Sequence, residues 1–134
     1  MKVLLDTHVL VWLCEGSDRL GKKALNLINQ ALASEQLAVA TISFWEIAML
    51  VEKGRLEMST DLADFRHKLL ADGLNEVTLS GSTAIKAAAL AGFHGDPADR
   101  IITATALDEG AKLVTADKNI LSWPGLNEKI NATK

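Results

Sequence analysis

The stretch Val3-Leu4-Leu5-Asp6-Thr7-His8 changes character in its middle and so decides how the chain begins to fold. Residues 2–5 include a short apolar run that is typical of a buried β-strand. Residues 7–13 follow without a break and are compatible with a helix, so we expect the chain to pass from strand to helix at Asp6. An acidic residue therefore stands where the first strand ends.

The rest of the chain repeats this alternation of strands and helices. Further strands are expected over residues 37–41, 76–79 and 112–115, and helices over residues 21–33, 44–53, 61–71, 83–91 and 97–109, with a short helical turn from 117. This order predicts the α/β class, with a parallel sheet of four to five strands covered on both faces in an α/β/α sandwich. Residues 127–134 are expected to form either an edge strand or a loose tail.

Length and charge limit the kinds of protein that this chain can be. With 134 residues, of which 49% are hydrophobic, we expect residues 1–134 to bury one core as a single domain. The 17 acidic residues outnumber the 14 basic ones, and the net charge of -3 gives no general attraction to nucleic acid. A nucleic-acid function must therefore depend on a local site.

The sequence gives no sign of a membrane or secretory segment. No run approaches the roughly 18 apolar residues of a membrane span, and the polar residues from Asp6 interrupt the N-terminal apolar run before it resembles a signal peptide. The single cysteine, Cys14, excludes an internal disulfide, and we expect it to be a small buried core residue. We therefore expect a cytoplasmic protein without membrane association.

Acidic residues stand at the points where strands give way to helices. Asp6 follows the first strand and Asp117 lies two residues beyond the last, while Glu46 and Asp99 fall in the first turns of two helices. In an open parallel sheet these junctions gather at one edge, beyond the carboxyl ends of the strands, where ligands bind. The four carboxylates are therefore expected to converge.

Converging carboxylates repel one another unless they are protonated or neutralised. A hard divalent cation such as Mg²⁺, for which Mn²⁺ is a possible substitute, resolves this conflict because it prefers oxygen ligands and is held by carboxylates together with substrate phosphate. Such a cation can polarise a phosphoryl oxygen and activate water. The pattern indicates hydrolysis of a phosphodiester bond.

Each acidic residue also has a local explanation. Asp6 and Asp117 are equally suited to cap the helices that follow them, and Asp96 before Pro97 is a good N-cap for its helix. Ser43 and Glu46 have the spacing of a capping box, with Ser43 as the N-cap. Only the shared position of these residues at one sheet edge separates a site from a set of caps.

Four sequence marks, in order along nearly the whole chain, make it resemble the PIN-domain endoribonucleases and in particular VapC-type toxins of prokaryotic toxin–antitoxin pairs. The marks are Leu4-Leu5-Asp6-Thr7-His8 with Trp12 downstream, Ser43-Phe44-Trp45-Glu46-Ile47, Asp96-Pro97-Ala98-Asp99-Arg100 followed by Ala104-Thr105-Ala106, and Leu113-Val114-Thr115-Ala116-Asp117. The resemblance implies a PIN-like fold and an Mg²⁺-dependent endoribonuclease. It also implies an RNA substrate, a cognate antitoxin and a homodimer.

The resemblance also implies roles for individual residues. Asp6 and Asp99 match the aspartates that bind Mg²⁺ most directly, Glu46 matches the glutamate of the site, and Asp117 matches its last acidic position. Thr115 matches a hydroxyl residue that supports the site.

Three further residues are expected to support this acidic set rather than to belong to it. Asp96 is assigned to a cap or a supporting role, because Asp99 leads directly into the following helix. Thr7 and Arg100, which adjoin Asp6 and Asp99, are also included as supporting residues. Arg100 can either face RNA phosphate or pair with a carboxylate, and a solvated or paired arginine is favoured.

The histidines and tryptophans near these marks do not by themselves indicate chemistry. His8 and His94 lack metal-ligand spacing with another His or Cys, so both are expected to have structural or supporting roles. Trp12 and Trp45 are expected to be core or subunit-interface residues in preference to platforms for base stacking.

Two other functions are compatible with acidic residues at one sheet edge. A receiver-like signalling module needs a phosphoacceptor Asp at the end of a middle strand, but the second and third predicted strands end in Thr41 and Leu79. A catalytically inactive PIN-like binding module is the other alternative. The presence of all four acidic residues argues against it.

Overall fold

The strand that begins the chain lies in the middle of a five-stranded sheet. In this computed structural model, which describes residues 1–134, every strand pair is parallel and the order is β3-β2-β1-β4-β5. The strands are β1 (Val3–Leu5), β2 (Leu37–Ala40), β3 (Asn75–Val77), β4 (Lys112–Thr115) and β5 (Lys129–Asn131). The predicted α/β class and parallel sheet are confirmed, and the C-terminal residues form an edge strand.

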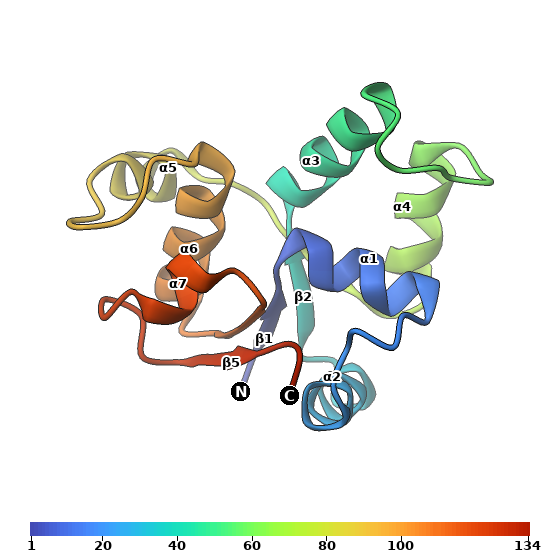
Figure 1. The fold of residues 1–134 in the computed structure, drawn as a ribbon, viewed down its shortest axis with the longest axis horizontal. Helices are drawn as coiled ribbons and strands as arrows, with labels where there is room; N and C mark the ends of the chain where they lie inside the picture. The colour runs from blue at the N-terminus through green and yellow to red at the C-terminus, as the bar shows by residue number, and fades with distance from the viewer.

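Seven helices surround this sheet. They are α1 (Thr7–Glu15), α2 (Lys22–Ala33), α3 (Thr41–Glu52), α4 (Leu62–Ala71), α5 (Gly81–Ala88), α6 (Pro97–Glu109) and α7 (Lys118–Ser122). Figure 1 shows α1, α3 and α4 to one side of the central strands and α5, α6 and α7 to the other. No helix is long and apolar enough to span a bilayer.

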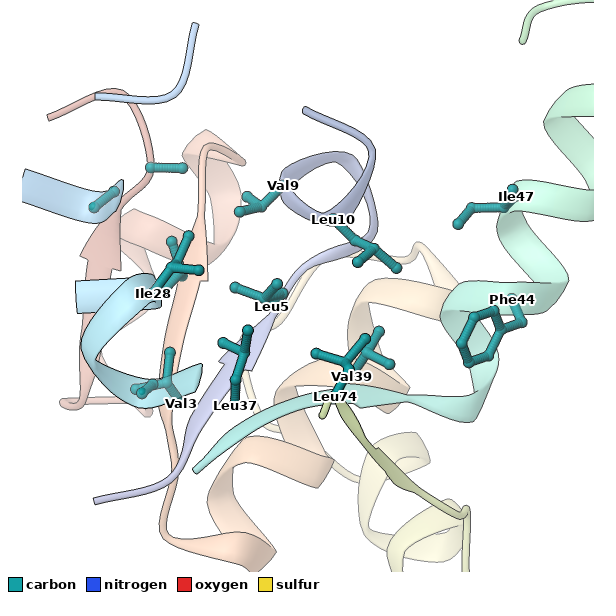
Figure 2. Packing of buried hydrophobic residues seen from close by; sticks show 14 residues of the cluster. Val3, Leu5, Val9, Leu10, Ile28, Leu37, Val39, Phe44, Ile47 and Leu74 are labelled. Atoms are coloured by element: carbon teal, nitrogen blue, oxygen red, sulfur yellow. The ribbon is translucent and has the colours of Figure 1, made fainter. Parts of the chain in front are cut away.

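Successive side chains of the strands pack into two hydrophobic cores, one on each face of the sheet. Leu5 and Val39 point into the first core, where they meet residues of α1, α2 and α3 such as Ile28 (Figure 2). Leu4 and Leu113 point into the second core, under α5, α6 and α7. Because successive residues of a strand face opposite sides of the sheet, the unbroken apolar runs of β1 and β2 are what a sheet covered on both faces requires.

Several helix ends follow the predicted local chemistry. Helix α1 ends at Gly16 and α6 ends at Gly110, each in the left-handed conformation with φ of 64° and 60°. Asp96 caps α6 by accepting a hydrogen bond from the backbone N–H of Asp99, and Pro97 occupies the first turn, as expected.

The start of α3 differs from the prediction. The helix begins at Thr41 directly after β2, and Ala40 occupies the N-cap position without a side-chain hydrogen bond, so the capping box of Ser43 and Glu46 is wrong. The hydroxyl of Thr41 instead bonds to Glu76, at 2.6 Å from its Oε2. Ser43 is fully buried inside the helix and bonds to Thr7. The local pattern was therefore overridden by contacts with distant segments.

Smaller differences affect other elements. Strand β3 covers 75–77 and not 76–79, β2 ends at Ala40, and α5 begins two residues earlier than predicted because Ser80 caps it through the N–H of Thr83. The expectation that Cys14 is buried is wrong, because this residue lies exposed near the end of α1.

Candidate active site

The predicted acidic residues come together in one cavity of about 410 Å³. Leu5 pairs with Val39 on one side and with Val114 on the other, so the carboxyl ends of the three central strands are level. The residues that follow these strands therefore meet at one edge of the sheet. The cavity is lined by Asp6, His8, Trp12, Glu46, Asp96, Asp99, Ala116 and Asp117.

Asp6 lies at the bottom of this arrangement and is only 6% exposed. One carboxylate oxygen accepts the N–H of Thr7 at 2.8 Å, which caps α1, and the other accepts the hydroxyl of Thr115 at 2.6 Å. The backbone N–H of Asp6 also donates to Val114 at 3.0 Å. The cap and the contact with β4 together fix the carboxylate, so capping and site roles do not exclude each other.

Asp117 is joined to the same group through Thr115. The hydroxyl oxygen of Thr115 accepts the backbone N–H of Asp117 at 3.0 Å while its proton goes to Asp6. Asp117 in turn caps α7 by accepting the N–H of Ile120 at 3.0 Å through Oδ1. A fully buried threonine thus couples the two strand-end aspartates across β1 and β4.

Glu46 reaches the cavity from the side of α3. Its Oε1 accepts a hydrogen bond from the hydroxyl of Thr7, which also bonds to the hydroxyl of Ser43 at 2.8 Å. Thr7 and Ser43 are both buried, so this contact fixes α3 against the start of α1. The hydroxyl of Thr7 thus contacts both Glu46 and the buried Ser43.

Asp99 enters the cavity from the first turn of α6. Its Oδ2 lies 2.8 Å from Nε2 of His94, and its side chain is 15% exposed. When Asp99 is ionised, its carboxylate can only accept a hydrogen bond, so Nε2 of His94 is then the donor. Asp96 is exposed and uses Oδ1 for the cap of α6, so it lines the opening of the cavity while Asp99 lies deeper.

Arg100 holds the loop that presents His94. Its guanidinium donates to the carbonyls of His94 and Phe93 at 2.9 Å each, and to that of Ala87 at 3.2 Å. The His94 ring stacks on Phe93 with centroids 4.3 Å apart. Arg100 forms no ion pair with a carboxylate; it is paired with backbone carbonyls instead, and it supports the site by holding this loop.

Burial and mutual repulsion change the acidity of these carboxyls. Burial raises the pKa of Asp99 to about 6, the hydrogen bond from His94 opposes this rise, and Asp6, Asp96 and Asp117 add to it. Burial also raises the pKa values of Asp6 and Glu46, against the hydrogen bonds from Thr115 and Thr7 respectively. The negative charges are therefore costly without a counter-ion.

The ligand atoms present fit a hard divalent cation. One carboxylate oxygen of Asp99 and one of Asp117 lie within 4.8 Å of each other and of a ring nitrogen of His94, which orients Asp99. One carboxylate oxygen of Glu46, one of Asp99 and one of Asp117 accept no hydrogen bond from the protein. Fixed carboxylates with free oxygens, in a group that is repulsive when empty, are what Mg²⁺ or Mn²⁺ takes as ligands.

His94 has the supporting role expected for it, but its contact with Asp99 was not predicted from the sequence. It lies five residues before Asp99 in a loop, a spacing that matches no metal-binding pattern. Only the loop conformation held by Arg100 brings the two side chains together. His8 and Trp12 line the cavity, whereas Trp45 is 56% exposed and is not a core residue.

The raised pKa of Asp99 predicts how the stability of the metal-free protein depends on pH. A carboxyl with a folded-state pKa near 6 and an unfolded value near 3.8 stabilises the fold below the unfolded pKa and loses this contribution as pH rises through 6. Asp99→Asn should therefore become more stable relative to the wild type between about pH 4 and pH 7, by on the order of 2 kcal/mol.

Urea unfolding in EDTA at several pH values measures this difference. Asp99→Asn keeps the shape of the side chain and its ability to accept from His94, so it isolates the effect of the charge. A difference in the free energy of unfolding that stays constant from pH 4 to pH 7 would show that Asp99 is not the group that is destabilised by its neighbours.

Comparisons with known proteins place this site in a family. The PIN domain family model matches residues 3–124. Ribonuclease VapC22 from Mycobacterium tuberculosis is 40% identical over 121 residues, which is 90% of each chain. Two solved structures share the fold. A toxin–antitoxin complex from Klebsiella pneumoniae matches with a TM-score of 0.64 and 21% identity, and the match covers 98% of each chain. VapBC2 from Rickettsia felis, bound to a promoter DNA fragment, matches with a TM-score of 0.69 and 19% identity, and the match covers 94% of this chain and 96% of that one. The chain therefore belongs to the PIN-domain family.

Proposed function

We propose that this chain is a divalent-metal-dependent endoribonuclease, the toxin of a toxin–antitoxin pair, which hydrolyses RNA phosphodiester bonds at the cavity formed by Asp6, Glu46, Asp99 and Asp117. The observation that carries the proposal is the convergence of these four carboxylates, two from the ends of β1 and β4 and two from α3 and α6. The identity to a ribonuclease over 90% of the chain supports the same reaction.

The metal ligands in this proposal are the four carboxylates of the cavity, with Mg²⁺ as the cation and Mn²⁺ as a substitute. When bound, the cation supplies Lewis acidity toward the phosphodiester and offsets its charge. Thr115 and the cap of α1 hold Asp6 in place, and the cap of α7 holds Asp117. Because these contacts already fix the two carboxylates, the carboxylates need little reorganisation during the reaction.

Burial changes how Glu46 and Asp99 bind protons. In the cavity without a cation, burial raises both pKa values, that of Asp99 to about 6, so both carboxyls take up a proton more readily than free carboxyls do. Glu46 keeps Oε2 free of hydrogen bonds while Thr7 holds Oε1. In this proposal Oε2 of Glu46 is therefore the oxygen available to the cation.

The proposal includes a protein partner and a compartment. Toxin–antitoxin complexes among the proteins of this fold support a cognate antitoxin that holds the nuclease in check in the cytoplasm. A cavity of about 240 Å³ between α1, α3, α4 and the segment before α4 offers an apolar surface for such a partner, through Val11, Leu56, Met58 and Phe65. A homodimer is also expected, and Ile85 on α5, 75% exposed, gives an apolar face for it.

Replacing Asp6 by Asn tests the catalytic assignment. The change removes a charge with little change of shape, so the fold should remain while metal-dependent RNA cleavage falls by roughly 100-fold or more. The measurement is the cleavage rate of a labelled RNA with Mg²⁺, with circular dichroism to verify the fold.

Asp18→Asn is the matched control, because Asp18 is exposed and makes no hydrogen bond through its side chain. It should cleave like the wild type. Cleavage retained in Asp6→Asn would contradict the assignment of this residue, and a wild-type chain without metal-dependent cleavage would contradict the proposed function itself.

A second prediction concerns His94 as a positioning residue. His94→Ala removes the hydrogen bond that orients Asp99, so both Mg²⁺ affinity and the cleavage rate should fall by about 10-fold to 100-fold. His94→Gln retains an N–H donor at a similar reach and should recover most of this loss.

Calorimetric titration with Mn²⁺ measures the affinity separately from the activity. His67→Ala, at an exposed histidine of α4, is the control and should leave both quantities unchanged. If His94→Ala bound and cleaved like the wild type, Asp99 would not need this hydrogen bond.

A further inference from the structure

We infer that a groove along α3, beside the acidic cavity, binds an unpaired segment of the RNA and leads it to the carboxylates. This inference rests on the proposed ribonuclease function and extends it to the path of the substrate. The groove has a volume of about 320 Å³, and Trp45, Met49, Lys53 and Arg55 form its part outside the acidic cavity.

The groove is continuous with the acidic cavity. His8, Glu46 and Asp96 line both hollows, so a strand that lies in one passes directly into the other. Glu46 and Trp45 are neighbours in the sequence, on adjacent faces of the same helix turn. A nucleotide seated against Trp45 is therefore next to the carboxylates that act on the backbone.

Helical spacing places the distinctive groove residues in one row. Trp45, Met49 and Lys53 follow each other at intervals of four, which puts them on one face of α3 and at its end. The row is about 12 Å long at a rise of roughly 1.5 Å per residue. Trp45 is 56% exposed, so most of a large aromatic ring faces solvent along this row.

The end of α3 brings two positive charges together. Gly54 adopts the left-handed conformation with φ of 70°, and the backbone N–H of Arg55 returns to the carbonyl of Leu50 at 2.9 Å. This turn places Arg55 beside Lys53 at the end of the helix. Neither side chain forms an ion pair, in contrast with Arg66 and Lys86, and both line the groove.

An exposed aromatic ring in the same groove as unpaired cations is a combination that recognises single-stranded nucleic acid. Aromatic side chains stack on unpaired bases, and cations follow the phosphates. The net charge of the chain is -3, and the adjoining cavity is acidic, so attraction to RNA has to come from a local group of this kind. Lys53 and Arg55 supply it at one end of the row, and Trp45 supplies the stacking surface near the carboxylates.

The composition of the groove favours RNA over a second copy of the chain. Only three of its nine lining residues are hydrophobic, and it contains two cations and two carboxylates. The core of a protein interface is depleted of charge. Ile85, the most exposed large apolar side chain, lies on α5 in the group of helices on the other side of the sheet (Figure 1).

Binding of a single-stranded RNA oligonucleotide in EDTA tests the inference without cleavage. With an oligomer of about ten nucleotides, the wild type should show quenching of tryptophan fluorescence as it binds. Trp45→Leu should bind at least about fivefold more weakly and lose most of this quenching, whereas Trp45→Phe should retain most of the affinity. Trp45 is exposed, so neither change threatens the fold.

The charge of the groove is tested by the salt dependence of the same binding. The double variant Lys53→Gln/Arg55→Gln should reduce the slope of log affinity against log salt by about 1.4, which corresponds to two lost phosphate contacts on a single strand. Lys22→Gln/Lys23→Gln removes the same charge from exposed positions in the first turn of α2 and should change the slope little.

Three results would overturn the inference. Variants of Trp45, Lys53 and Arg55 that bind RNA like the wild type would show that the strand takes another path, even if the wild type cleaves RNA with Mg²⁺ as proposed. An equal reduction of the salt slope in the Lys22→Gln/Lys23→Gln control would show that RNA is attracted by the general surface charge and not along a defined path. A Trp45→Leu variant that turns a dimer into a monomer in sedimentation would assign this face to contact between copies of the chain.

Discussion

Four carboxylates are held close together around Asp6, and their repulsion is the constraint on which the rest of the site depends. Asp6 is buried at the end of the central strand and cannot move away, because Thr115 and the backbone of Thr7 hold its two oxygens. Burial raises the pKa values of Asp6, Glu46 and Asp99 in the absence of a cation. This arrangement lowers the stability of the folded state, which is typical of functional sites.

The parallel sheet makes this concentration of charge possible. Level carboxyl ends of β1, β2 and β4 place three chain turns at one edge, and α6 adds Asp99 from its first turn. Helix caps orient the same aspartates that form the site, so local and functional roles reinforce each other. Beyond this acidic cavity, the adjoining groove along α3 ends at Lys53 and Arg55, so the two cations lie outside the acidic cavity.

The acidic residues that follow strands were the residues of the cavity most directly predictable from the sequence. Asp6 and Asp117 follow apolar strands, and parallel topology alone places them together. Ser43 led to a wrong start for α3, because the capping pattern considers only neighbouring residues. In the structure its hydroxyl forms a hydrogen bond with Thr7, which belongs to α1. The contribution of His94 was equally hidden, since it depends on a loop that Arg100 holds by its carbonyls. Exposure of Cys14 and Trp45 could not be predicted, because it depends on which helix faces remain uncovered in the tertiary structure.

The melting temperature with and without divalent metal tests most directly whether the acidic cavity is a metal centre. A cation that binds the folded state at this cavity stabilises it by mass action, and it removes the repulsion among the carboxylates. Millimolar Mg²⁺ or Mn²⁺ should therefore raise the melting temperature by several degrees above a sample of equal ionic strength in NaCl. An unchanged melting temperature under these conditions would contradict a metal centre at Asp6, Glu46, Asp99 and Asp117.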